Sequence, residues 1–207
     1  MPEEIKEQKP EQFKIFDLYD VSNIEVKDPA MKPYVCLTAK LLLKNQGRQT
    51  DKLRSTKINV VERLASRLAV PGHVGKEHKI ITSWSSGKYT HNMQTVLKAF
   101  ATIQEKTGKN PVQVFVEAIE NGSPRDEITV IESAGARYPQ AVDCSPIRRI
   151  NLAIRWIVQG AYNKSFGKKT KMADALANEI ILASKLNLES FAARKKTEAE
   201  AQADGAR

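Results

Sequence analysis

Residues 127–142 read EITVIESAGARYPQAV, and a different pattern follows directly at 145–161, SPIRRINLAIRWIVQGA. In the first stretch two β-prone runs flank a turn of small residues, which is typical of a β-hairpin. In the second, Ser145-Pro146 is a typical helix start, and the apolar residues after it recur every three or four positions. A hairpin with no third strand is marginally stable alone. We therefore expect it to protrude from a helical domain and to be held by a partner.

Helices are predicted on both sides of this pair. Apolar residues at helical spacing indicate helices over about 58–70, 89–107, 111–122 and 170–186, in addition to the one that starts at Ser145-Pro146. A sixth is possible near each end, and 35–43 can be read as extended or helical. The expected fold class is mainly α, a helical domain of about six helices with a protruding β-hairpin arm at about 127–143. We assign 13–196 to this single domain, 1–12 to a disordered N-terminal tail, and 197–207 to a frayed C-terminal tail.

The chain carries 33 Lys and Arg against 24 Asp and Glu, and the excess is concentrated in two segments. Residues 48–98 hold ten basic and three acidic side chains, and residues 144–171 hold seven basic side chains and none acidic. Clustered positive charge is typical of a surface that binds a polyanion, because each contact with a phosphate releases a condensed counterion. A merely solubilising surface is the alternative, and the absence of acidic partners in 144–171 argues against it. Composition alone does not distinguish DNA from RNA.

Several classes of protein are disfavoured. No apolar run approaches the roughly 20 residues of a membrane span, and the first residues lack the apolar block of a secretory signal, so we expect a cytoplasmic protein. Cys36 and Cys144 form no disulfide framework. The loop with His73 and His78, followed by His91, lacks a full set of zinc ligands. Glycine-rich nucleotide motifs and a nucleophile elbow are absent. The expectation is a protein that is not an enzyme and needs no cofactor or metal.

The two tryptophans have different expected roles. Trp156 lies at the edge of an apolar helix face, where core packing is the favoured role. Trp84 lies in a loop rich in Gly and Ser, where stacking on a base and packing against the domain are equally good readings. Tyr138 beside Arg137 suits an arm inserted into RNA, and it suits a sheet surface equally well.

Five stretches, in order along the chain, resemble a known family. They are Ile24–Pro29, Val60–Leu64, Lys106–Asn121, Ala141–Ile150 and Ala175–Ala183. Together they are similar to the universal small-subunit ribosomal protein family numbered seven in bacteria and five in eukaryotes. Gly72-His73 through Glu77-His78-Lys79 is similar to an insertion of the archaeal branch. The resemblance implies a structural component of the small ribosomal subunit in the cytoplasm that binds the 3′ major domain of small-subunit rRNA and organises assembly of the subunit head.

The resemblance also implies which residues make the contacts. The implied rRNA-binding residues are Arg48, Lys52, Arg54, Lys57, Lys76, Lys79, Arg148, Arg149, Lys168, Lys169 and Lys171. The implied arm and C-terminal residues that face exit-site tRNA and mRNA are Gly135, Ala136, Arg137, Tyr138, Arg194, Lys195 and Lys196. Neighbouring head proteins are further implied partners, and no membrane is implied. Two rivals stay open: a DNA-compacting protein that binds nucleic acid without specificity, and a small helical enzyme that uses the His73–His91 loop.

Overall fold

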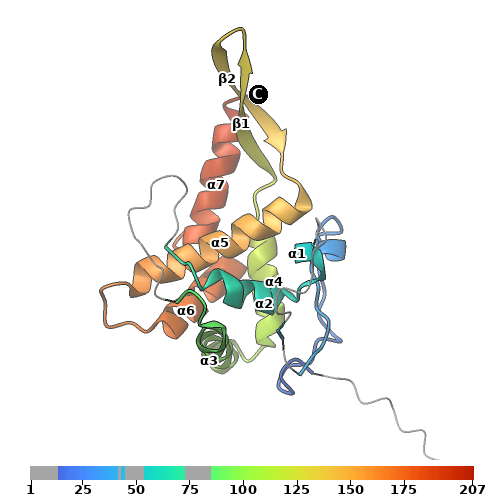
Figure 1. Cartoon of the computed structure of the whole chain (residues 1–207), viewed down its shortest axis with the longest axis vertical. Coiled ribbons are helices and arrows are strands. Elements are labelled where there is room, and N and C mark those ends of the chain that lie inside the picture. The colour runs from blue at the N-terminus through green and yellow to red at the C-terminus, as the bar shows by residue number, and fades with distance from the viewer. Residues whose placement is uncertain (1–13, 42, 45–53, 73–84) are drawn as a thin grey trace, which may run out of the picture.

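The structure is a computed structural model that describes residues 14–41, 43–44, 54–72 and 85–207. Within these ranges the helices are η1 (Lys32–Tyr34), α1 (Arg54–Lys57), α2 (Val60–Arg67), α3 (Tyr89–Thr107), α4 (Pro111–Gly122), α5 (Pro146–Ser165), α6 (Met172–Ser184) and α7 (Phe191–Asp204). The strands β1 (Asp126–Ser133) and β2 (Ala136–Asp143) form a two-stranded antiparallel sheet. The predicted fold, mainly α with a β-hairpin arm, is confirmed (Figure 1).

Helix α6 occupies the centre of the helical body, where it packs against α3, α4 and α5. Its sequence suits that place, because Leu176 and Ile180 are fully buried and small alanines on the same face let neighbouring helices approach. Phe100 of α3 and Phe115 of α4 are also fully buried, with ring centroids 6.0 Å apart. One continuous core therefore joins the central helices.

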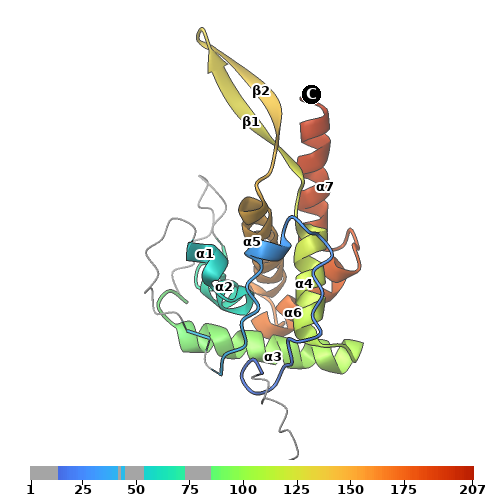
Figure 2. The same cartoon turned by 90° about the vertical axis from the view of Figure 1, so that its right-hand side faces the viewer.

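The segment before α1 runs beside α4, and its described residues contain one short 3-10 helix, η1, and no α-helix (Figure 2). Side chains of α4 and its cap hold the backbone of this segment in place. The Asn110 amide donates to the Asp20 carbonyl at 2.6 Å, and the Asp28 N–H donates to Glu120 Oε1 at 3.0 Å. Ile15 and Met31, which belong to this segment, are fully buried in the core. Of the two readings left open for 35–43, the described residues adopt the non-helical one.

The predicted helix over 58–70 corresponds to the single helix α2, and α1 is a separate short helix before it. Asn59 sets the start of α2, because its backbone leaves the helical region (ψ 137°) and its side chain accepts the Val61 N–H at 2.9 Å. The Asn59 amide also donates to the Thr38 carbonyl at 2.9 Å. The prediction of one helix here is confirmed, with a start two residues later and an end three residues earlier than expected.

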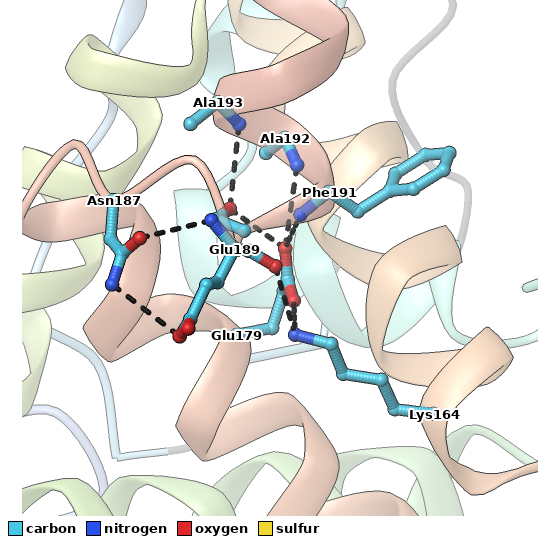
Figure 3. Close-up of polar contacts among 8 residues, drawn as sticks. Lys164, Glu179, Asn187, Glu189, Phe191, Ala192 and Ala193 are labelled. Carbon is cyan, nitrogen blue, oxygen red and sulfur yellow. Dashed lines mark hydrogen bonds and ion pairs between the residues drawn. The ribbon is translucent and has the colours of Figure 1, made fainter.

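A buried carboxylate joins α5 and α6 to the start of α7 (Figure 3). Glu179 Oε1 accepts the Ser190 hydroxyl at 2.7 Å and the Phe191 N–H at 2.6 Å, and its Oε2 pairs with Lys164 Nζ at 2.6 Å. A carboxylate is favourable there, because the first N–H groups of a helix lack partners and carry partial positive charge. Gly160 leaves the needed space, since a Cβ at that position would lie 2.7 Å from Phe191 Cβ.

The arm extends beyond the helices, as expected, and its tip is a tight turn (Figure 2). Ala134 and Gly135 both have positive φ, 51° and 79°, which is the geometry of a two-residue hairpin turn. Its base is held by the chain itself: Arg207 pairs with Asp126 at 2.5 Å, and the Arg125 N–H donates to Glu200 at 3.0 Å. Helix α7 thus supports the base of the arm, and an outside partner for the rest of the arm stays a prediction.

The expectation that 197–207 would fray is wrong for most of that range. Helix α7 continues to Asp204, although its sequence offers little apolar surface. Its contacts with β1 and β2 explain the difference, together with the fully buried Ala203 and the Arg207–Asp126 ion pair. Tertiary contact rather than helical periodicity stabilises this end.

Candidate nucleic-acid interface

Three arginines line a notch between α2 and α5. The notch has a volume of about 360 Å³, and Arg63, Arg67 and Arg155 form its charged wall, with Asn151 and Ser66 beside them. Local sequence places them there: Arg63 and Arg67 are four residues apart on α2, and Asn151 and Arg155 are four apart on α5, so each pair lies on one helix face. Because α2 packs against α5, the two faces meet.

The notch holds donors that have no partner in the described structure. Arg67 Nε and Nη2 and Arg155 Nε are buried and make no hydrogen bond with the described residues. Burial lowers the pKa of Arg67, and repulsion by the neighbouring Arg155 lowers it further. Arg63 differs, because it donates to Asn151 Oδ1 at 2.8 Å and is thereby fixed. Buried guanidinium nitrogens without a hydrogen-bond partner are costly, so this site favours an anion such as a phosphate.

A second basic surface lies on the loop between α5 and α6. Lys168, Lys169 and Lys171 are all exposed there, and none forms an ion pair with another described residue. Phe166, with 59% of its surface exposed, and Tyr162 lie beside these lysines with ring centroids 5.2 Å apart. The sequence predicted this loop as an rRNA contact, and the structure leaves its charges available.

Arg148 and Arg149, predicted as equivalent contacts, have different surroundings. Arg148 is about half exposed and donates to Glu127 Oε2 at 2.5 Å, and this hydrogen bond raises the pKa of the guanidinium. The side chain of Arg149 is only 11% exposed and pairs with Asp28 at 2.8 Å. Arg149 therefore joins α5 to the N-terminal segment, while Arg148 retains a solvent-facing side.

The residues predicted to face tRNA and mRNA lie in two places. At the arm, Arg137 pairs loosely with Glu132 at 3.5 Å and Tyr138 is 59% exposed, so both reach solvent beyond the helices. Lys196 is half-buried near the base of the arm, where burial lowers its pKa. The remaining two basic residues of α7, Arg194 and Lys195, both pair with Glu198.

Most of the other predicted residues lie in α1 or outside the described residues. Arg54 opens α1 and Lys57 ends it, with Lys57 exposed. The remaining predicted or candidate residues lie outside the described residues: Arg48, Lys52, His73, Lys76, His78, Lys79 and Trp84. Trp156 packs against the core, as the sequence favoured.

The described residues hold no group of three or more His, Cys, Asp or Glu side chains suited to a metal ion. Cys144 is buried, and this burial, with the nearby Glu127, raises the pKa of its thiol to about 11. At neutral pH it is therefore a thiol and a poor nucleophile. Within the same described ranges, no helix is both long and apolar enough to cross a membrane.

Comparison with known proteins identifies the family of this basic helical protein. The family model described as ribosomal protein S7p/S5e matches residues 37–207. The chain belongs to the S7p/S5e family. Three archaeal relatives, each named small ribosomal subunit protein uS7, are similar over nearly their whole length. The Nanoarchaeum equitans protein is 43% identical over 94% of this chain and 99% of its own, and the Archaeoglobus fulgidus protein is 37% identical over 95% and 96%. The Methanococcus maripaludis protein is 40% identical over 95% and 100%.

The S7p/S5e family consists of structural ribosomal proteins rather than enzymes, so the helical-enzyme alternative is wrong. The resemblance to the archaeal branch is confirmed by these relatives. Sequence reasoning missed Arg63 and Arg67 as candidate contacts, and it placed Arg155 with Arg148 on the polar face of their helix without naming it as a contact. The four-residue spacing of Arg63 and Arg67 was the available signal. Their burial against α5 depends on the fold, which the spacing does not reveal.

Proposed function

We propose that this chain is a structural component of the small ribosomal subunit, binds the 3′ major domain of small-subunit rRNA and organises the subunit head. Membership of the S7p/S5e family supports the ribosomal role. The observation that carries the rRNA contact is the notch between α2 and α5, where Arg67 and Arg155 present buried donors without partners. A phosphate in the notch would satisfy these donors and would relieve the repulsion between the two guanidinium groups.

Recognition would depend on shape. The grooves of A-form RNA hide most base edges from side chains, so a protein that binds folded RNA depends on the positions of phosphates and 2′-hydroxyls. The notch and the lysines Lys168, Lys169 and Lys171 lie at separate places on the helical body. Two such phosphate-binding surfaces, held rigidly by one core, would select an RNA junction whose helices are correctly spaced.

The test is a salt titration of the affinity for a multi-helix junction from the 3′ major domain, beside duplex RNA and duplex DNA of equal length. We expect the junction to bind about a thousand-fold more tightly or better, with log K falling steeply as log salt rises. Equal binding of all three would contradict the proposal and would favour the alternative, a non-specific nucleic-acid protein that compacts DNA. The titration thus separates shape recognition from simple attraction to a polyanion.

We further propose that the arm and α7 contact exit-site tRNA and mRNA, while neighbouring head proteins contact other surfaces. The arm suits such a contact, because Tyr138 and Arg137 reach solvent beyond the helical body. No carboxylate in the arm opposes Arg137 except Glu132, among the described residues, and that pair is exposed and weak.

A shortened arm tests this division of labour. Residues 130–139 are replaced by an Asn-Gly turn, which keeps the pairing of Thr129 with Gln140 and fits a two-residue hairpin. We expect affinity for the rRNA junction to stay close to that of the intact chain, because the notch and the loop lysines are untouched. Reconstituted small subunits should sediment normally and retain less deacylated tRNA. Subunits that lack the head would contradict the assignment.

A further inference from the structure

The exposed ring of Phe166 lies at a cavity that is separate from the notch between α2 and α5. The cavity has a volume of about 370 Å³ and lies between the start of α3 and the loop that joins α5 to α6. Phe166 has 59% of its surface exposed, and its ring lies 5.2 Å from that of Tyr162 with 31° between the planes. The Phe166 N–H donates to the Tyr162 carbonyl at 2.8 Å, so the backbone that carries the ring is fixed.

The lining of the cavity combines apolar and polar side chains, with His91 among the polar ones. Leu68, Pro71 and Met172 supply apolar surface, and the side chains of Asn92 and Thr95 supply amide and hydroxyl groups. Among the described residues, none of those that line the cavity carries a carboxylate. A cavity of this size, with apolar walls and a few polar groups, is typical of a site for a small planar ligand.

The charge around the cavity indicates which planar ligand fits. Lys168, Lys169 and Lys171 follow Phe166 directly, and all three are exposed. Aromatic faces combined with lysines that follow a backbone are typical of sites for unpaired nucleotides, where bases stack and phosphates pair with the lysines. An apolar side chain of a protein partner would gain nothing from three lysines.

We propose that an unpaired base of the bound RNA stacks on Phe166 and reaches into this cavity, while the flanking phosphates contact Lys168 and Lys169. This inference rests on the proposed rRNA-binding function and adds a site for a single base to it. The Asn92 amide donates to the Ser85 carbonyl at 3.2 Å and the Thr95 hydroxyl donates to the His91 carbonyl at 3.0 Å, so these two side chains would offer their oxygens as acceptors to the edge of the base. The notch between α2 and α5, by contrast, offers only charge and hydrogen-bond donors for a phosphate.

The test compares Phe166→Leu with Phe166→Tyr in the full chain, bound to an RNA fragment of the 3′ major domain. Leu keeps apolar volume but lacks a ring face, whereas Tyr keeps the face. We expect Phe166→Leu to weaken binding about five-fold to a hundred-fold and Phe166→Tyr to bind as the unmodified chain does. The dependence of log K on log salt should be the same for all three, since no charge is removed. Leu188→Ala, at another exposed apolar residue, is the matched control and should change nothing.

Chemical probing of the same complexes locates the base. With the unmodified chain, one unpaired base should be protected from base-modifying reagents, and Phe166→Leu should restore its reactivity while backbone protections elsewhere persist. Unchanged affinity and unchanged base reactivity in Phe166→Leu would overturn the inference. That result would leave the junction selectivity of the unmodified chain intact, so a failure here is distinguishable from a failure of the proposed function.

Discussion

Substitution of Glu179 by Ala is expected to lower the free energy of unfolding by about 2–4 kcal/mol, because each buried donor left without an acceptor costs about 1–3 kcal/mol. The carboxylate is fully buried and accepts bonds from Ser190 and Phe191 while it pairs with Lys164. Its loss leaves the first N–H groups of α7 without a partner in the protein interior. Urea unfolding followed by far-UV circular dichroism measures the change.

Glu179→Gln is the matched variant. The amide oxygen can still accept from Ser190 and Phe191, and Lys164, which is 38% exposed, can turn toward water. We expect the free energy of unfolding to fall less in the Gln variant than in the Ala variant. Limited proteolysis should cleave near 187–191 sooner in the Ala variant. Equal stability of the Ala variant and the unmodified chain would show that the carboxylate does not hold α7.

The second large effect is on RNA binding, and it should come with no loss of stability. In Arg67→Met combined with Arg155→Met, the notch loses both unpaired guanidinium groups. If each makes charge-assisted contacts worth about 1.5–3 kcal/mol, affinity for the rRNA junction should fall roughly a hundred-fold or more. The slope of log K against log salt should become shallower by about 1.5.

The stability of the same double variant should stay equal or rise. Burial and mutual repulsion lower the pKa of Arg67, which means that the folded state disfavours its charged form. At neutral pH that charge destabilises the free protein, and a methionine of similar length removes the cost. Fluorescence anisotropy measures the expected loss of RNA affinity, and urea unfolding measures the expected equal or higher stability.

The double variant Lys106→Met with Lys109→Met is the control, because it removes the same charge at the end of α3, where Lys106 bonds to Asn178. An equal loss of affinity in this control would contradict a specific role for the notch.

Local sequence patterns predicted the elements that form from local contacts. Asn110-Pro111 marks the start of α4, and the Asn110 side chain caps it by accepting the Val112 N–H at 3.0 Å. Gly108, at φ 66°, ends α3 where the sequence placed the end. The turn at Ala134 and Gly135 was likewise expected from the small residues between two β-prone runs.

The features that sequence did not predict depend on contacts between distant residues. Glu179 reads as an ordinary charged position on a helix, and only the packing of α5 and α7 around it makes it buried. Arg148 and Arg149 are adjacent and look equivalent, yet Asp28, more than a hundred residues away, draws Arg149 into the protein. A sign reversal at both would therefore disturb folding as well as RNA binding. The RNA-binding role of each candidate residue stays a prediction.

The orientation of the arm depends in part on its attachment to α7. Asp126 and Arg125 at the base of the arm bond to Arg207 and Glu200, and α7 is in turn held at its other end by Glu179. Together with the Arg148–Glu127 pair, a carboxylate at the opposite end of α7 therefore helps to set the direction in which the arm points. Substitutions deep in the body, such as Glu179→Ala, should therefore weaken the proposed contacts of the arm with exit-site tRNA and mRNA by misaligning the arm.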